Sequence, residues 1–127
     1  MTDGDTIRVR LGSGRVERVR YIGIDTPETG KPDAPGECYA DRAQAFNERL
    51  VRDGGVELAL DVDERDRYGR LLAYVYAGRV LVNAELLRAG YAKQLTVPPN
   101  VRFETRFGRL ARDARQANRG LWGACAS

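Results

Sequence analysis

The stretch VRYIGIDTPET, residues 19–29, decides how the rest of the sequence is interpreted. Its first half has the composition of a β-strand, and Pro27 ends that strand because proline lacks a backbone amide hydrogen. Side chains alternate along a strand, so Arg20 shares one face with the two isoleucines and needs an anionic partner there. Asp25 and Glu28 are then expected at the strand's end, at a solvent-accessible opening.

The tetrapeptide DGDT, residues 3–6, adds a third carboxylate, Asp5, at the start of another extended run. Carboxylates that gather without histidine suit a hard divalent cation, which takes oxygen ligands and leaves positions for water and phosphate. Asp5, Asp25 and Glu28 therefore form a candidate phosphodiesterase site. The alternative interpretation makes Asp25 a turn residue before proline and Glu28 a solvated loop charge.

The composition narrows the possible chemistry. The chain has 127 residues, a formal net charge of +3, two cysteines and no histidine. This length favours one domain, residues 1–127, and no apolar run is long enough to span a bilayer. The lack of histidine excludes histidine base catalysis and Ser-His-Asp triads. The basic residues are nearly all arginines, which suit bidentate contacts to phosphate, although genomic base composition or thermal adaptation is an alternative explanation.

Hydrophobic periodicity and turn signals predict the order of the elements. Extended runs are expected at residues 5–11, 15–24, 56–62 and 71–77, and the first two form a hairpin around a Gly-Ser-Gly turn. Helices are expected at residues 38–52, in a short segment that Asn83 caps and Gly90 closes, and between Asn100 and Gly120. Residues 27–37 are predicted to form a long surface loop, and residues 91–100 an irregular linker.

Two arginine-rich segments have competing interpretations. In the turn ERDRYGR, residues 64–70, we interpret Arg65 and Asp66 as solvated charges, whereas Arg70 lies beside a glycine at the start of a strand and is expected to reach a ligand. The outer face of the last helix carries the arginines Arg102, Arg106, Arg109, Arg112 and Arg115. That face is either a solvated surface or a nucleic-acid contact.

Four separated motifs agree in order and spacing: DGDT, R-x-x-x-x-D-T-P-E, D-R-Y-G-R and a late helix that ends in G-L-W. They resemble the staphylococcal nuclease (thermonuclease) family over almost the whole chain. The resemblance implies a mainly β fold, an OB-type five-stranded barrel with three α-helices. It also implies a calcium-dependent nuclease that hydrolyses DNA and RNA, preferably single-stranded, to 3'-phosphate and 5'-hydroxyl ends.

The resemblance assigns roles to the acidic residues by position. Asp5 and Asp25 would supply calcium carboxylates, and Thr26 would add its backbone carbonyl. Glu28 would act as the base that activates water. These roles agree with the chemistry, because a glutamate near a cation can orient a water molecule.

The resemblance also assigns roles to the basic residues. Arg20 and Arg70 would hold the scissile phosphate, where two positive charges stabilise the charge that builds on the phosphoryl oxygens. Arg67 and Tyr68 would contact the bound nucleotide.

The chain departs from the family pattern at two places. The family prototype has two tyrosines after its second helix, where this chain has residues 96–99, TVPP. We therefore expect weaker base stacking there. Only Met1 and Thr2 precede the metal motif in this sequence, so the first strand is expected to be truncated.

Two competing functions remain open from the sequence. One is a non-catalytic OB-fold module that binds single-stranded nucleic acid through arginine and aromatic contacts. The other is an interaction domain on the same fold, which would not need Arg20 and Arg70 together. The presence of Asp5, Asp25 and Glu28 favours catalysis, because a pure binder gains nothing from three acids near a polyanion.

The two cysteines, Cys38 and Cys125, lie at the start of the first predicted helix and beyond the last one. An even count at two element ends predicts a disulfide, with two free buried thiols as the alternative. A disulfide would indicate a secreted or cell-envelope protein, and we expect a monomer.

Overall fold

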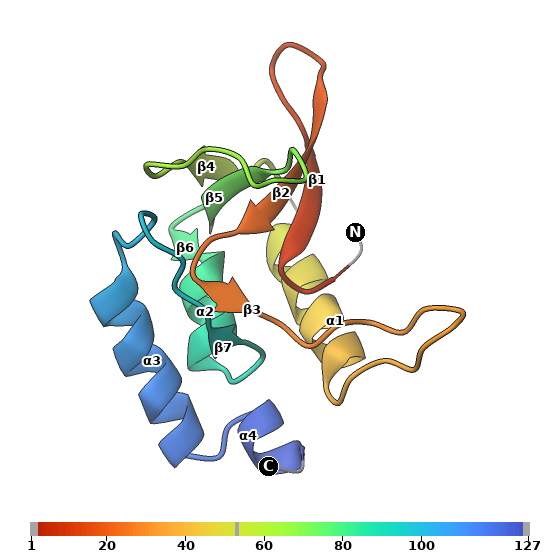
Figure 1. Cartoon of the computed structure of the whole chain (residues 1–127), viewed down its shortest axis with the longest axis vertical. Coiled ribbons are helices and arrows are strands. Elements are labelled where there is room, and N and C mark those ends of the chain that lie inside the picture. The colour runs from red at the N-terminus through yellow and green to blue at the C-terminus, as the bar shows by residue number, and fades with distance from the viewer. Residues whose placement is uncertain (1–2, 53, 126–127) are drawn as a thin grey trace.

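A curled mixed sheet, a half-barrel, forms the centre of the structure (Figure 1). The structure is a computed structural model that describes residues 3–52 and 54–125. The strands of this sheet are β1 (Thr6–Arg10), β2 (Val16–Tyr21), β5 (Leu71–Ala77) and β4 (Glu57–Ala59), in that order, and β6 (Val80–Leu81) pairs with β5. The pair β2 and β5 is parallel and the other pairs are antiparallel. This architecture is consistent with the expected OB-type fold.

Helices cover the sheet and its open end (Figure 1). They are α1 (Ala40–Val51), α2 (Val82–Arg88), α3 (Glu104–Gln116) and the one-turn α4 (Leu121–Ala124). The core lies between β5, α2 and α3, where Tyr74 packs edge-on against Phe103 and Phe107. No helix in the described part of the chain is long and apolar enough to cross a membrane.

The predicted strand at residues 15–24 is wrong in one respect, because it is interrupted before its acidic end. β2 ends at Tyr21, and a separate strand, β3 (Ile24–Asp25), pairs with β7 (Lys93–Gln94). The break is at Gly23, whose φ of +83° suits glycine, and a Cβ there would lie 2.7 Å from the Phe107 ring. The strict alternation of buried faces also fails, since both Tyr21 and Ile22 are buried.

The predicted role of Asn83 as a helix cap is also wrong. Helix α2 begins at Val82, and Asn83 is fully buried within its first turn. Its Oδ1 accepts the amide of Val75 at 2.9 Å, and its Nδ2 donates to the carbonyl of Ile22 at 2.8 Å. The side chain therefore satisfies backbone groups that the strand break would otherwise leave unpaired.

Other predicted boundaries of helices and strands differ from the observed ones, because long-range contacts determine where these elements begin and end. The first helix starts at Ala40 instead of residue 38, and the extended run predicted at residues 56–62 pairs only over Glu57–Ala59. The linker predicted at residues 91–100 contains β7, whose pairing with β3 comes from a distant part of the chain.

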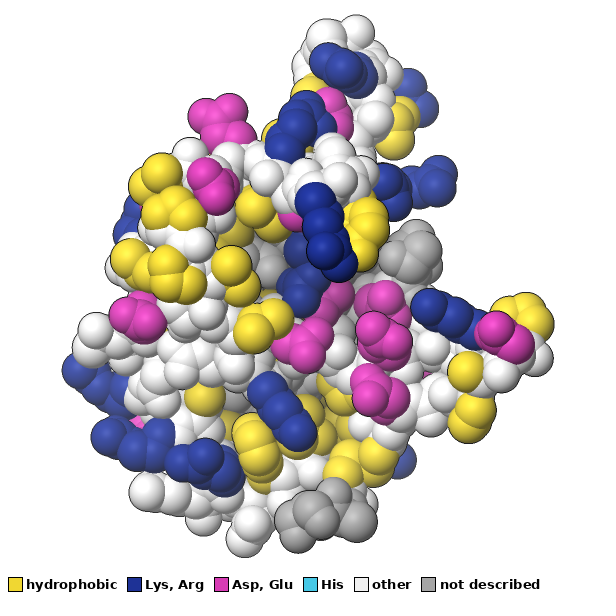
Figure 2. All heavy atoms as spheres, viewed as in Figure 1, with side chains coloured by type: hydrophobic (Ala, Val, Ile, Leu, Met, Phe, Trp, Pro, Cys, Tyr) yellow, Lys and Arg dark blue, Asp and Glu magenta, His cyan; other side chains and the backbone are white. Residues whose placement is uncertain are grey.

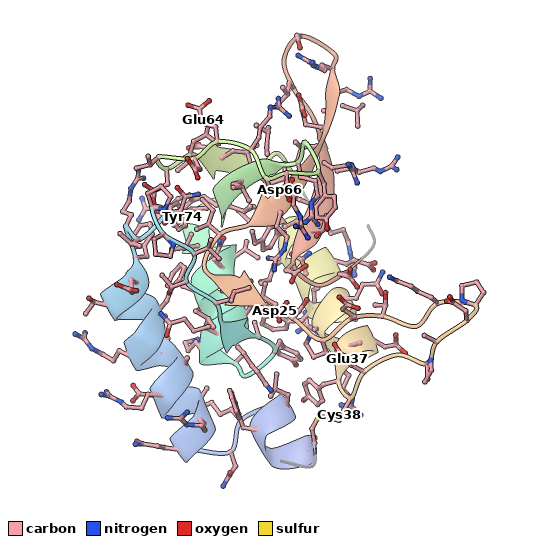
Figure 3. All side chains as sticks on the ribbon, viewed as in Figure 1. Asp25, Glu37, Cys38, Glu64, Asp66 and Tyr74 are labelled. Atoms are coloured by element: carbon pink, nitrogen blue, oxygen red, sulfur yellow. A yellow bond between two sulfur atoms is a disulfide. The ribbon has the colours of Figure 1, made fainter. Side chains whose placement is uncertain are left out.

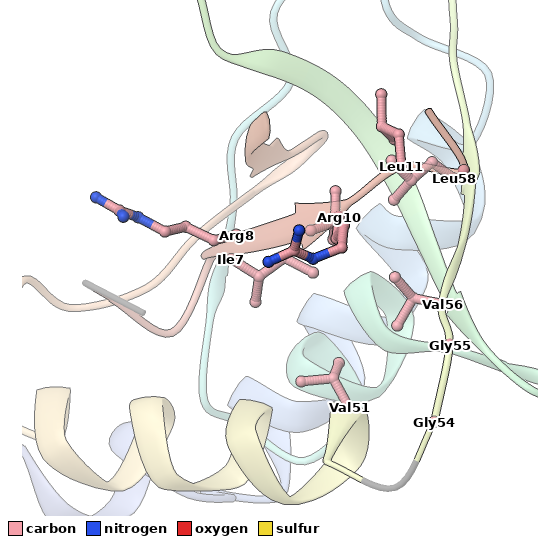
Figure 4. Close-up of a pocket in the computed structure, with 11 residues that line it drawn as sticks. Ile7, Arg8, Arg10, Leu11, Val51, Gly54, Gly55, Val56 and Leu58 are labelled. Atoms are coloured by element: carbon pink, nitrogen blue, oxygen red, sulfur yellow. The ribbon is translucent and has the colours of Figure 1, made fainter. Parts of the chain in front are cut away.

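The order of the strands leaves β1 and β4 at the two edges of the sheet. Between them lies a cavity of about 560 Å³, lined on the apolar side by Ile7, Leu11, Val51, Val56 and Leu58 (Figure 4). The cavity holds no carboxylate among the residues that line it. The predicted acidic residues lie instead near the C-terminal end of β2.

Candidate active site

The carboxylate of Asp5 links the DGDT stretch to the end of β3. Asp5 is only 5% exposed, and its Oδ2 accepts the backbone amide of Thr26 at 3.0 Å. Its Oδ1 accepts the hydroxyl of Thr6 at 3.2 Å, and its carbonyl accepts the amide of Tyr21 at 2.9 Å. These contacts hold a buried carboxylate beside the acidic end of β3.

Arg20 lies between two of the predicted acidic residues. Its Nη2 is 3.4 Å from Oδ2 of Asp5 and 3.5 Å from Oδ1 of Asp25. Its Nη1 donates to the carbonyls of Tyr21 and Ile24 at 2.8 and 2.9 Å. The expected anionic partner is therefore present, and the two carbonyls fix the plane of the guanidinium group.

The acidic side chains near Asp25 repel one another. Burial raises the pKa of Asp25, the charge of Arg20 opposes that rise, and the charges of Asp5, Glu37 and Glu28 add to it. Figure 2 shows acidic side chains gathered near the middle of this face, and Figure 3 shows Asp25 and Glu37 on adjoining segments. Such a cluster attracts a cation, because a cation relieves the repulsion.

The oxygen atoms of Asp5, Asp25 and Thr26 are of the kind that a hard cation binds. Two carboxylates, from Asp5 and Asp25, lie beside Thr26, whose Oγ1 is buried and has no hydrogen-bond partner among the described residues. Within residues 3–52 and 54–125, no three acidic or cysteine side chains form a complete metal site by themselves. A cation here would take its remaining ligands from water and substrate, as calcium with its six to eight oxygen ligands readily does.

Glu28 lies on the long loop, and two acidic residues that the sequence analysis did not select position it. The amide of Glu28 donates to Oε1 of Glu37 at 2.6 Å. Oδ1 of Asp3 accepts both the amide and the hydroxyl of Thr29 at 3.0 Å. Asp3 belongs to the DGDT motif, which was a usable signal, whereas no local pattern singles out Glu37.

Arg70 is held in place by Asp66. Its Nε donates to Oδ2 of Asp66 at 2.7 Å, while Oδ1 accepts the amides of Tyr68 and Arg70 at 2.9 and 3.0 Å. Burial alone would raise the pKa of Asp66, but these hydrogen bonds outweigh it and lower the pKa. The interpretation of Asp66 as a solvated charge is therefore wrong, because its side chain is only 18% exposed.

Arg65 is also more than a solvated charge. It forms a two-pronged ion pair with Glu17, with both N–O distances at 3.0 Å. It also donates to the carbonyl of Gly69 at 2.8 Å. These contacts tie the turn that carries Arg70 to β2.

A cavity of about 210 Å³ brings Arg20 and Arg70 together. Leu95 and Val97 also line it, so the linker after α2 does face this cavity and presents aliphatic side chains to it. Tyr68 supplies an aromatic surface nearby: it is 60% exposed, and the Arg70 guanidinium lies 5.5 Å from its ring centroid. Arg67 donates to the hydroxyl of Tyr68 at 2.8 Å. The two residues expected to contact the nucleotide therefore lie next to Arg70.

The structure contains the disulfide between Cys38 and Cys125. Both cysteines line a cavity of about 290 Å³ together with Asp25, Thr26 and Glu37. The bridge therefore joins the loop that carries Glu28 to α4 at the end of the chain.

Comparisons with known proteins agree with this geometry. A model described as staphylococcal nuclease homologue matches residues 18–124. The chain is 38% identical to a thermonuclease of Staphylococcus hyicus over 94% of this chain and 70% of that protein. It is 37% identical to a thermonuclease of Staphylococcus intermedius over 94% of this chain and 71% of that protein. It is 41% identical to the SPbeta prophage-derived endonuclease YokF of Bacillus subtilis over 94% of this chain and 41% of that protein. The chain belongs to the staphylococcal nuclease family.

Proposed function

We propose that this protein is a calcium-dependent nuclease that hydrolyses DNA and RNA with low sequence specificity. The observation that carries the proposal is that Arg20 makes two kinds of contact. It pairs with Asp5 and Asp25, and it also lines the cavity that contains Arg70. A phosphodiester in that cavity would meet the guanidinium groups of Arg20 and Arg70, and Arg20 also pairs with the carboxylates of Asp5 and Asp25. Relatives named thermonuclease and endonuclease support the same activity.

Calcium is the cofactor that we propose for this cluster. Asp5, Asp25 and Thr26 would hold it, and when bound it would neutralise charge on the phosphate and provide coordination positions for water. The proposal draws support from Oγ1 of Thr26, which is buried without a hydrogen-bond partner in the described part of the chain, and from the raised pKa of Asp25.

Glu28 is our candidate for the general base. Its side chain is exposed at the edge of the cluster, where it can accept the proton of an attacking water. The water oxygen forms a bond to phosphorus while the bond between phosphorus and the 5'-oxygen breaks, and the leaving 5'-oxygen takes up a proton from solvent water. The products are a 3'-phosphate and a 5'-hydroxyl. Arg20 and Arg70 would hold the phosphoryl oxygens as negative charge builds on them.

A non-catalytic single-strand binding module is the competing function, and one assay distinguishes the two. Single-stranded DNA and RNA are incubated with calcium or with a chelator, and the product ends are identified. Our proposal requires calcium-dependent products with 3'-phosphates and faster cleavage of single strands than of duplex. Binding without cleavage under all metal conditions would favour the module.

The proposal also covers the cellular location and the oligomeric state of the protein. The disulfide supports a secreted or cell-envelope location, because disulfides persist in oxidising compartments. We propose that the protein acts as a monomer, which sedimentation at micromolar concentration would test.

A further inference from the structure

One face of the β1–β2 hairpin carries a row of arginines that starts at the candidate active site. In the antiparallel register, Arg18 lies opposite Arg8, and the positions two residues along each strand are Arg20 and Arg10. Alternate residues of paired strands share a face, so these four side chains lie on the same side of the hairpin. The other face is buried, as Val19 at 0% exposure indicates.

Arg20 pairs with Asp5 and Asp25, but the other three arginines of this row form no ion pair within the described part of the chain. Arg8 and Arg18 lie directly opposite each other, a like-charge pairing that destabilises a sheet unless an anion lies nearby. The hairpin's own glutamate, Glu17, pairs with Arg15 and Arg65. Among the described residues, neither Arg8 nor Arg10 forms an ion pair. Arg8 and Arg10 both line the cavity between β1 and β4, and in Figure 4 the guanidinium group of Arg8 points outward from it.

The row is continuous with the cavity that contains Arg20 and Arg70. Nη2 of Arg18 donates to the carbonyl of Tyr68 at 3.2 Å, and the ring of Tyr68 lies 5.5 Å from the guanidinium of Arg70. Figure 2 shows basic side chains from the hairpin toward the middle of this face, where the acidic side chains gather. A strand whose phosphate binds at Arg20 therefore meets further arginines along the hairpin.

We propose that the hairpin face formed by Arg8, Arg10 and Arg18 is a binding track for the backbone of a single-stranded nucleic acid beyond the scissile phosphate. The inference rests on the proposed function, since it extends that site. Two residues of a strand advance about 6.6 Å, which is close to the spacing of consecutive phosphates in an extended single strand. Such a strand can follow the twist of the hairpin, whereas a rigid duplex cannot.

The test compares two double variants that remove the same charge. Arg8→Ala/Arg10→Ala changes the track, and Arg106→Ala/Arg109→Ala changes the exposed face of α3. Fluorescence anisotropy in chelator measures the affinity for a labelled 20-nucleotide strand, a dinucleotide and a 20-base-pair duplex at several salt concentrations. Thermal unfolding of each variant verifies that the fold is intact, and Arg8→Lys/Arg10→Lys tests whether positive charge alone restores binding.

We expect the track variant to bind the 20-nucleotide strand about tenfold less tightly, with a salt slope lower by about 1.4, the value for two lost phosphate contacts on a single strand. The loss should be at least fivefold larger for this strand than for the dinucleotide. The α3 variant should stay within about twofold of the wild type, and the lysine variant should recover most of the affinity.

Three results would contradict the proposed track. They are an equal loss of affinity in the two alanine variants, an unchanged affinity in the track variant, and a loss of affinity for the duplex as large as that for the single strand. The test is separate from the proposed function, because binding is measured without calcium. A protein that binds through the track but does not cleave with calcium would refute the nuclease proposal and support the track.

Discussion

The backbone amide of Glu28 donates a hydrogen bond of 2.6 Å to Oε1 of Glu37, and the amide of Glu37 donates one of 2.9 Å to the carbonyl of Glu28. This reciprocal pair joins the two ends of an exposed loop. The backbone of Glu28 is thus fixed while its carboxylate stays accessible, which is the arrangement that a general base needs.

Replacing Glu28 with glutamine should lower kcat by about 10²- to 10⁴-fold, the usual contribution of a positioned base, because the amide cannot accept the proton of water. Nucleotide affinity should change little. Glu64→Gln is the control, since Glu64 is an exposed glutamate outside the cluster. Steady-state kinetics on single-stranded DNA with calcium measure the effect. A rate equal to that of the control variant would remove Glu28 from the mechanism.

Arg20→Ala and Arg70→Ala should each lower kcat by about 10²- to 10³-fold, because charge aimed at the developing transition state is lost. Arg109→Ala should alter the rate less than twofold, since Arg109 is exposed on α3. Comparison of kcat at saturating substrate separates these effects from weaker binding. Similar losses in all three variants would indicate that diffuse attraction, not fixed geometry, supports the activity.

Asp66→Asn should destabilise the protein by about 1 kcal/mol at neutral pH and lower kcat roughly tenfold, because the hydrogen bonds that orient Arg70 weaken. The folded-state pKa of Asp66 is lowered, so its stabilising contribution is present above the ordinary pKa of about 4 and is lost as the pH falls through the lowered value. Urea unfolding from pH 7 to pH 2 should show the two proteins converge at low pH. A constant difference at every pH would contradict this account.

Replacing both cysteines with serine should lower the free energy of unfolding by about 4 kcal/mol, since the bridge closes a long loop. The sequence separation of the two cysteines is 87 residues. Urea unfolding measures the loss, and alkylation followed by mass spectrometry of the non-reduced wild type verifies the bridge. Two alkylatable thiols in oxidatively produced protein would contradict the disulfide and weaken the argument for export.

The features that the sequence predicted correctly depend on local patterns. Residues 71–77, LLAYVYA, form a strand with the expected bounds, because the run is apolar and a turn precedes it. The hairpin around the Gly-Ser-Gly turn and the apolar stripe of α3 also follow from short-range periodicity. For Arg20 the expected acid is present, since Asp5 and Asp25 both pair with it, but the premise of a strand face shared with two isoleucines is wrong because β2 ends at Tyr21.

The features that it missed depend on contacts between distant segments. The break at Gly23 follows from the Phe107 ring, which a helix more than 80 residues away presents to it. Asn83 resembles a helix cap locally, yet its amide pairs with backbone groups of β5 and Ile22. Asp66 and Glu37 were classed as surface charges for a different reason: their partners are near in the sequence, Arg70 four residues after Asp66 and Glu28 nine residues before Glu37, but composition does not specify the turn and loop conformations that bring the groups together.

The disulfide also determines which cleavages of the backbone leave the fragments covalently connected. A protease that cleaves between Cys38 and Cys125 leaves fragments that the bridge keeps covalently joined. A cut in the exposed residues 30–37 lies outside that ring and removes the covalent link to the segment that carries Asp5, Arg20 and Asp25, which non-covalent contacts then retain, among them the pairing of β2 with β5 and of β3 with β7. A single nick in this projecting loop therefore separates the segment that carries Asp5, Arg20 and Asp25 from the segment that carries Arg70.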